Sequence, residues 1–170
     1  MMDVRRAVDE HVESNPGVHF NELARNLDIA TGQAQYHLRN LRKAGSLDVE
    51  EVRGRTHYFP PGYDPWEQRT IALLRRETVR SIIVAALEEP EPSAADLAAD
   101  LDVARSTISW HVSTLIEADV AEKTYDQKGR SHITLTRPAE TRQLLGEVTP
   151  SLPDRLVDRF TRLVDDTLVD

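Results

Sequence analysis

Apolar residues recur at helical spacing in the first part of the chain and outline two short helices. Leu23, Ala24 and Leu27 stand at positions i, i+1 and i+4, so they form one apolar face of a first helix. A connector of three to four residues, with Ile29 as its apolar side chain, leads to a second helix. The inward positions of that second helix are Ala34, Leu38 and Leu41. Gly45 ends it, because glycine accepts the left-handed conformation past a helix end, and the whole pattern predicts a helix-turn-helix.

The same pattern returns 74 positions further on, where Leu97–Ala118 aligns with Leu23–Ala44 without a gap. Eight positions of the first copy find an identical residue in the second: Leu23, Ala24, Leu27, Asp28, Ala30, His37, Leu41 and Ala44. In the second copy Ser93 and Asp96 form a capping box that fixes the start of its first helix. A period this long, present twice, predicts two copies of one small domain rather than a solenoid array.

Two short extended runs follow the helix pair in each copy. In the first copy they are Leu47–Val52 and Thr56–Phe59, with Arg53-Gly54-Arg55 between them. In the second copy they are Ala121–Tyr125 and Ser131–Thr136, separated by residues 126–130. Glycine between alternating runs predicts a β-hairpin, and a helix-turn-helix followed by a hairpin is the winged-helix arrangement.

The strings HFNELARNLDIATGQAQYHLRNLRKAG and RSTISWHVSTLIEADV resemble archaeal and bacterial ArsR/MarR-like winged-helix transcription regulators. More narrowly, the chain resembles haloarchaeal regulators that carry two such domains, and the resemblance covers about residues 1–137. It implies a mainly α fold with small β-hairpins (α+β), in which two tandem winged helix-turn-helix domains are joined by a helical linker and followed by C-terminal helices. We expect these parts in order at residues 1–62, 63–77, 78–137 and 138–170.

Length and composition exclude several other classes of protein. A chain of 170 residues holds two small domains but not one large enzyme core. It has no cysteine, hence no disulfide or thiolate site, and its six histidines are scattered without a metal-ligand spacing. Phosphate-loop and dinucleotide motifs are absent. We therefore expect no catalytic residue, metal or cofactor, and the sequence identifies no small-molecule effector. Without a signal peptide or an 18-residue apolar run, we expect a cytoplasmic protein that does not enter membranes.

A net charge of −8 opposes DNA binding, because affinity for the duplex depends on neutralising its phosphates with basic residues. The basic residues are 18 Arg and only three Lys, and with the surplus of acids this composition is typical of an extreme halophile. In molar salt the Debye length falls to about 3 Å, so distant acids barely repel phosphates. Residues 19–62 hold six basic and five acidic residues, whereas 93–137 hold five and seven. The first copy is the better candidate for binding double-stranded DNA.

The second helix of the first copy carries amide, guanidinium and aromatic groups, and no acid, on the side opposite its inward residues. Gln and Asn can pair bidentately with adenine and Arg with guanine. Basic residues flank the glycine of the hairpin turn, where a wing approaches phosphates or the minor groove. The DNA-binding residues predicted in the first copy are Thr31, Gln33, Gln35, Tyr36, Arg39, Asn40, Lys43, Arg53 and Arg55.

The second copy presents a weaker face, since Glu117 replaces Lys43 and an outward Trp110 is costly to leave in water. It is either a second DNA reader or a packing and partner surface; in the latter case the protein is a tandem winged-helix scaffold that binds protein. Its outward side includes Thr114, and His37 and His111 at matched positions predict a repeated structural role such as a hydrogen bond. The DNA-binding residues predicted here are Arg105, Ser106, Thr107, Ser109, Trp110, Ser113, Lys128 and Arg130.

The linker and the C-terminal segment also have helical patterns. Trp66–Glu89 is helical, and Thr78–Glu89 would be the first helix of the second copy. A helix after Pro138 runs to Val148, and a last one spans Pro153–Leu168. The apolar stripe of that last helix either packs on the second copy or forms the seam of a homodimer. The residues predicted for such a seam are Leu156, Phe160, Leu163 and Val164.

Overall fold

The computed structural model describes residues 3–148 and divides the chain into two compact units, Met1–Ala72 and Leu73–Asp170. Within the described residues there are eight helices and two small antiparallel sheets. The mainly α fold with small hairpins, and a helix-turn-helix in each half, is therefore confirmed. No helix in residues 3–148 is both long enough and apolar enough to cross a membrane.

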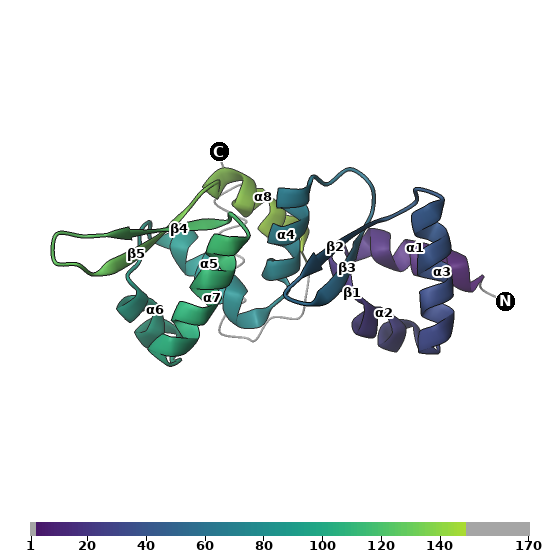
Figure 1. Cartoon of the computed structure of the whole chain (residues 1–170), viewed down its shortest axis with the longest axis horizontal. Coiled ribbons are helices and arrows are strands. Elements are labelled where there is room, and N and C mark those ends of the chain that lie inside the picture. Colours follow the sequence, from purple (N-terminus) through teal and green to yellow (C-terminus); the bar gives the residue numbers. More distant parts are fainter. Residues whose placement is uncertain (1–2, 149–170) are drawn as a thin grey trace. The chain divides into compact units, whose positions relative to one another are not determined.

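Unit 1 consists of three helices, a small sheet and the helix that leads out of it (Figure 1). Strand β3 pairs antiparallel with both β1 and β2, so the sheet order is β1-β3-β2. We call the β2–β3 hairpin wing 1. The elements are α1 (Val4–Ser14), β1 (Val18–His19), α2 (Phe20–Leu27), α3 (Thr31–Lys43), β2 (Asp48–Val52), β3 (Arg55–Phe59) and α4 (Pro65–Leu74).

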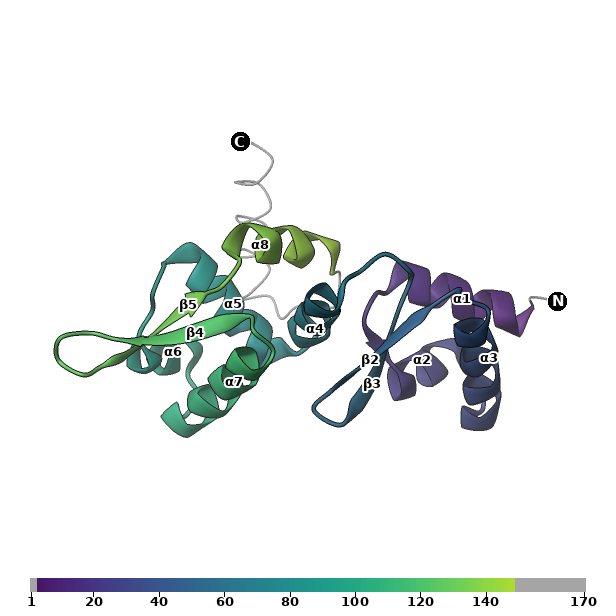
Figure 2. The same cartoon turned by 45° about the horizontal axis from the view of Figure 1, so that its top comes forward.

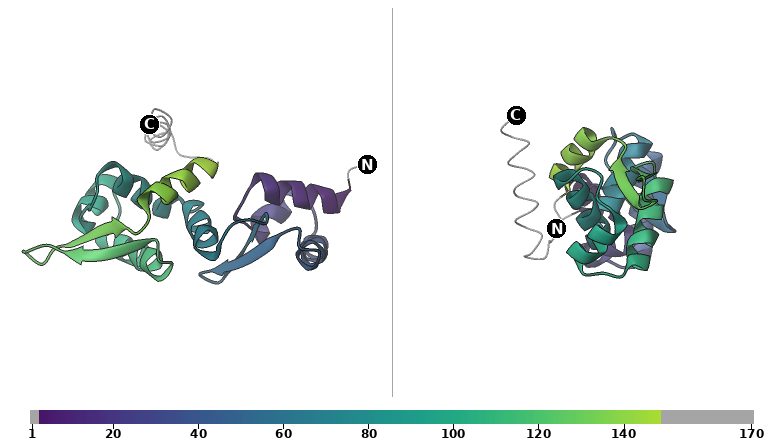
Figure 3. Two further views of the ribbon diagram at one scale, coloured as in Figure 1. Left: turned by 90° about the horizontal axis from the view of Figure 1, so that it is seen from above. Right: turned by 90° about the vertical axis from the view of Figure 1, so that its left-hand side faces the viewer.

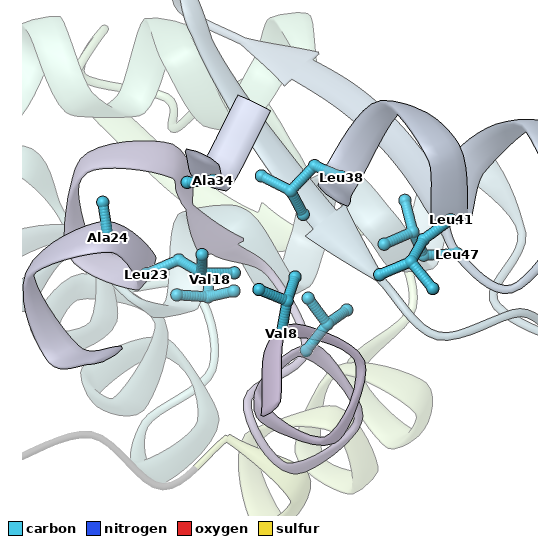
Figure 4. Close-up of a cluster of buried hydrophobic side chains, with 9 residues drawn as sticks. Val8, Val18, Leu23, Ala24, Ala34, Leu38, Leu41 and Leu47 are labelled. Atoms are coloured by element: carbon cyan, nitrogen blue, oxygen red, sulfur yellow. The ribbon is translucent and has the colours of Figure 1, made fainter. Parts of the chain in front are cut away.

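The core of unit 1 lies where α1 packs against α2 and α3 (Figure 4). All three inward positions predicted for the second helix are buried there, together with side chains from α1, β1 and α2. Burying one Leu or Val side chain contributes about 1.5–3 kcal/mol, so this cluster fixes the position of α3. Its members are Val8, Val12, Val18, Leu23, Ala24, Ala34, Leu38, Leu41 and Leu47.

Unit 2 repeats the order of three helices and a hairpin, and adds one more helix (Figures 2 and 3). We call the β4–β5 hairpin wing 2; its end extends beyond the helices of its own unit (Figure 2). The predicted helical run from Trp66 to Glu89 is two helices that are interrupted at residues 75–76. The elements of unit 2 are α5 (Glu77–Glu88), α6 (Ala94–Leu101), α7 (Arg105–Glu117), β4 (Ala121–Tyr125), β5 (Ser131–Leu135) and α8 (Pro138–Glu147).

The helix ends repeat between the two units as the sequence does. The Ser93 hydroxyl accepts a hydrogen bond of 3.0 Å from the Asp96 N–H, so the predicted cap of α6 is confirmed. Asp28 and Asp102 end α2 and α6 in the left-handed region, with φ of 52° and 54°. Past α3, Gly45 takes a φ of 76° as predicted.

The two wings differ in how their strands are joined. In wing 1 the turn is only Arg53-Gly54, both at positive φ (50° and 75°), as a two-residue type I′ hairpin requires. Arg55, which the sequence placed between the strands, is instead the first residue of β3. In wing 2 residues 126–130 separate the strands, and the Asp126 carboxylate accepts hydrogen bonds from two backbone N–H groups of this loop. Wing 2 is therefore the longer hairpin.

Candidate nucleic-acid interface

Helix α3 buries one side in the core and leaves the other open to solvent. The residues predicted to bind DNA are exposed, except Asn40, which is half-buried; the Tyr36 side chain is 61% exposed. The helix contains no carboxylate, and its last turn carries Arg42 and Lys43. Basic residues near a helix C-terminus also interact favourably with the helix dipole. The structure thus places a cationic, amide-rich surface on the second helix of the helix-turn-helix. Its exposed members are Thr31, Gln33, Gln35, Tyr36, Arg39 and Lys43.

A pair of ring contacts recurs on the two matched helices. The rings of Tyr36 and His37 meet edge to face with centroids 5.2 Å apart, and those of Trp110 and His111 do so at 5.0 Å. Within residues 3–148 the buried Nδ1 of His37 has no hydrogen-bond partner. The two histidines thus share an aromatic contact, and the hydrogen bond given as an example of their expected role is not found for His37.

Wing 1 is held against the body of unit 1 by a buried histidine. A hydrogen bond of 2.7 Å joins His57 Nδ1 to the carbonyl oxygen of Gly17, in the turn before β1. Arg53 and Arg55 are exposed at the tip of the wing. Arg55 and Gln35 line one cavity, so the wing and α3 bring predicted residues together. This hydrogen bond of His57 was not predicted from the sequence, although the repeat aligns His57 with His132.

Helix α7 in unit 2 presents a mostly neutral face. Trp110 is 52% exposed, and Thr114, expected on the same face, is buried and donates its hydroxyl to the Trp110 carbonyl oxygen at 3.2 Å. The Ser113 hydroxyl donates to the Ser109 carbonyl oxygen at 2.9 Å. The last turn contains no basic residue. The remaining predicted residues of α7 are exposed: Arg105, Ser106, Thr107, Ser109 and Ser113.

The side chains of Arg130 and His132 in wing 2 lie beside a carboxylate. Arg130 Nε and His132 Nε2 both meet Asp126 Oδ2 at 2.9 Å, and His132 Nδ1 meets the Glu91 carbonyl oxygen at 2.9 Å. The hydrogen bond with His132, followed by those from Arg130 and Lys128, holds the pKa of Asp126 well below its usual range. The same bond raises the pKa of His132, and the Glu91 carbonyl adds to this. Asp126 therefore offsets the positive charge of Arg130.

The sequence predicted no metal site, and it predicted a homodimer seam in the C-terminal segment. In the part of the chain that the structure describes, no group of three or more His, Asp or Glu side chains is arranged to hold a metal ion. The residues predicted for the homodimer seam (Leu156, Phe160, Leu163 and Val164) lie outside the described residues.

Comparison with protein families finds a helix-turn-helix in each unit. An N-terminal HTH domain family matches residues 2–71, and a Helix-turn-helix domain family matches residues 78–124. An uncharacterized HTH-type transcriptional regulator of Methanocaldococcus jannaschii is 29% identical over 113 residues, which are 66% of this chain and 28% of that protein. The match therefore spans little more than a quarter of the relative's length.

Solved structures that resemble the chain include two proteins of different kinds. The cadmium metal sensor CmtR of Mycobacterium tuberculosis has a TM-score of 0.40 and 28% identity, covering 50% of this chain and 93% of that one. A chain of the ESCRT-II endosomal trafficking complex has a TM-score of 0.34 and 13% identity, covering 81% of this chain and 65% of that one. Together, the two family matches establish that the chain contains two helix-turn-helix domains, one in each unit.

Proposed function

We propose that the protein is a cytoplasmic transcription regulator that binds double-stranded DNA in a sequence-specific way, chiefly through α3 and wing 1 of unit 1. The observation that carries this proposal is the open face of α3: in a chain of net charge −8, it has no carboxylate and carries the basic residues Arg39 and Lys43. The helix-turn-helix families matched by both units, and the relative described as a transcriptional regulator, support the same function.

The side chains on this face suit base recognition. Gln33 and Gln35 lie near the start of α3 and carry amides that can pair with adenine, and Arg39 can pair bidentately with guanine. Tyr36, held edge-on by His37, offers an apolar ring to thymine methyl groups. The acidic remainder of the chain is compatible with DNA binding if the protein works in molar salt, as its Arg-rich, Lys-poor composition indicates.

The test is to separate base reading from phosphate contact at Arg39. Once chromatin immunoprecipitation with sequencing has defined an operator, Arg39→Ala is compared with the matched variant Ser113→Ala in multimolar KCl. Loss of a bidentate contact should weaken operator binding roughly 5- to 150-fold, and binding to random DNA by less. Equal losses on the two DNAs would show that Arg39 touches only phosphate.

The proposed regulator is a homodimer, because a two-fold axis presents the same α3 to two half-sites of an operator. The support is the sequence pattern alone, in which Leu156, Phe160, Leu163 and Val164 form one apolar stripe. Phe160→Glu in the full chain should give the mass of one protomer in light scattering at high salt. A variant that keeps the dimer mass would place the seam elsewhere.

A second candidate function, binding of a protein partner through unit 2, is favoured by the exposed indole of Trp110. The chain has two tryptophans, and Trp66 is buried whereas Trp110 is 52% exposed. In Trp66→Phe protein, acrylamide quenching reports on Trp110 alone. Protection of Trp110 by operator DNA would assign α7 to DNA, and unchanged quenching on saturating DNA would favour the protein partner.

A further inference from the structure

A cavity of about 530 Å³ lies in unit 1 between the first turns of α2, the helix α3 and the tip of wing 1. Its polar lining comes from all three elements: Asn21 and Arg25 from α2, Gln35 from α3, and Arg55 and Thr56 from β3. Among the described residues that line it, none is Asp or Glu. In a chain with 29 acidic residues, a cavity with two guanidinium groups and no carboxylate favours an anion as its ligand.

The two arginines of this cavity are not committed to acids of the protein. Within residues 3–148 neither the Arg25 nor the Arg55 side chain has a hydrogen bond or an ion pair. Other exposed arginines do have such partners, for example Arg6 with Glu10 at 2.8 Å. Charge-assisted bonds from a guanidinium group to an oxyanion are among the stronger hydrogen bonds, so a ligand anion gains two such donors here.

Three further polar side chains of the lining carry donors suited to a tetrahedral oxyanion. The Asn21 side-chain amide and the Thr56 hydroxyl can each donate to one oxygen, and Gln35 lies at the edge where the cavity meets the open face of α3. Phe20 and Asn21, the first two residues of α2, also line the cavity, so the positive end of the helix dipole adds to the field of the arginines. A phosphate group matches this combination of charge and donors.

Unit 2 has the same fold but lacks most of the polar side chains that line this cavity in unit 1. At the three positions that align with Asn21, Arg25 and Gln35, unit 2 has small side chains that carry neither charge nor amide: Ala95, Ala99 and Ser109. The counterpart of Arg55 is Arg130, whose Nε is paired with Asp126 at 2.9 Å. The repeated helix-turn-helix therefore folds without these polar groups, so unit 1 does not need them for its fold.

We propose that this cavity binds one phosphate group, and that the group belongs to the DNA backbone. The inference rests on the proposed function and adds to it Arg25, a residue outside both the recognition helix and the wing. Gln35 belongs to the cavity and to the open face of α3, so a phosphate held here lies on the strand next to the bases that α3 reads. Arg25 and Arg55 then hold the same phosphate from two sides and fix the position of α3 in the groove.

The experiment measures how the affinity of the full chain for a short random duplex depends on KCl. The logarithm of the binding constant falls with log[KCl] by about 0.9 for each neutralised phosphate. If the two arginines share one phosphate, Arg25→Gln with Arg55→Gln should reduce that slope by about 0.9, and each single variant should show part of the loss. Arg5→Gln, an exposed arginine of α1, is the matched control and should leave the slope unchanged. An unchanged slope in the double variant, or a reduction of about 1.8 that indicates two separate phosphates, would overturn the proposal.

A second arm distinguishes failure of the inference from failure of the proposed function. If the wild-type chain does not bind duplex DNA, the proposed function is wrong, and inorganic phosphate tests the cavity by itself. Phosphorus NMR line broadening of inorganic phosphate by wild-type protein, lost in Arg25→Gln, would retain a phosphate site with a free ligand. No broadening together with no DNA binding would remove the site altogether. Circular dichroism of each variant checks that the helices are intact.

Discussion

Wing 1 and wing 2 are tied to their units by the same bond and yet expose different chemistry. His57 Nδ1 meets the Gly17 carbonyl oxygen at 2.7 Å, and His132 Nδ1 meets the Glu91 carbonyl oxygen at 2.9 Å. In both units the carbonyl belongs to a residue with positive φ shortly before the second helix. The histidine bonds, the helix caps and the buried leucines thus give both units the same backbone fold. They do not determine which residues occupy the exposed surface.

The two copies differ in the residues that they expose on α3 and α7 and on the wings. Lys43 in the last turn of α3 becomes Glu117 in α7, and Arg39 becomes Ser113. Arg130 of wing 2 is paired with Asp126, whereas Arg55 of wing 1 has no such partner in the described residues. Because donors that are not paired with acids of the protein are better placed to contact phosphates and bases, we expect DNA binding by unit 1 to be stronger than by unit 2.

The first helices of the two units also differ: here, within the described residues, the arginine without a hydrogen-bond partner belongs to unit 2, and it is buried. Arg6 in α1 is 76% exposed and paired with Glu10, but Arg80, at the position that aligns with it in α5, is only 2% exposed. Burial, and then the nearby Arg75, lower the pKa of Arg80 to about 10. In the described part of the chain its Nε and Nη2 have no hydrogen-bond partner. The arginine that is exposed on α1 of unit 1 is therefore a buried cation on α5 of unit 2.

The largest effect we expect is the loss of operator binding when the α3 face is removed. Gln35→Ala with Arg39→Ala deletes two side chains that can each contribute about 1–3 kcal/mol of base discrimination, so operator affinity should fall thirtyfold or more. The matched change in unit 2, Ser109→Ala with Ser113→Ala, deletes only hydroxyls. The Ser113 hydroxyl already donates to the Ser109 carbonyl oxygen, so a much smaller loss is expected. Fluorescence anisotropy on labelled operator compares the two. Equal losses would mean that both copies read bases and that the charge difference is a poor guide.

Some features of the fold and of the candidate site could be predicted from the sequence, and others could not. The periodicity of Leu23, Leu38 and Leu41 and the glycine turns predicted α2, α3 and both hairpins, because core burial and turn geometry act locally. Helix α1 and the short strand β1 were not predicted. Thr114 was placed on the wrong side, since a hydroxyl that bonds to the Trp110 carbonyl oxygen can be buried in a helix. Arg25 and the Asp126–His132 pair were missed, because they depend on segments that meet only in the folded unit.

An intermediate effect is expected on stability when Arg80 is replaced. A buried donor without a partner costs about 1–3 kcal/mol, and Met has a similar length without the charge, so Arg80→Met should raise the free energy of unfolding by roughly that amount. Arg6→Met, at the aligned exposed position, should cause no measurable change. Urea unfolding followed by circular dichroism measures both variants. Destabilisation by Arg80→Met would show that the guanidinium group contributes a favourable contact and would remove this contrast between the units.

The smallest effect concerns the pH dependence of wing 2. Both ring nitrogens of His132 face acceptors, the Asp126 carboxylate and the Glu91 carbonyl oxygen, and only the protonated ring can donate to both. The raised pKa of His132 means that its contribution to wing stability is complete below its usual 6.5 and is lost as the pH rises through the higher folded value. The pKa of Asp126 is lowered from 3.8, so its contribution is complete above that value and is lost only in stronger acid. Arg130, which also faces the pair, lowers the pKa of His132 slightly and does not reverse the direction.

Amide hydrogen exchange by NMR, corrected for the intrinsic rate at each pH, reports on this directly. The Lys128 and Arg130 amides donate to the Asp126 carboxylate, so their protection should fall as His132 loses its proton. In wing 1 the bond from His57 to Gly17 needs a single ring proton, which neutral histidine supplies, so protection of Tyr58 should not follow the same titration. Asp126→Asn should bring the pKa of His132 back toward its usual value and leave wing 2 poorly protected at every pH. Protection in wing 2 that stays constant through the titration of His132 would show that the backbone bonds alone hold the loop, and the two wings would then differ in length and charge but not in their response to protons.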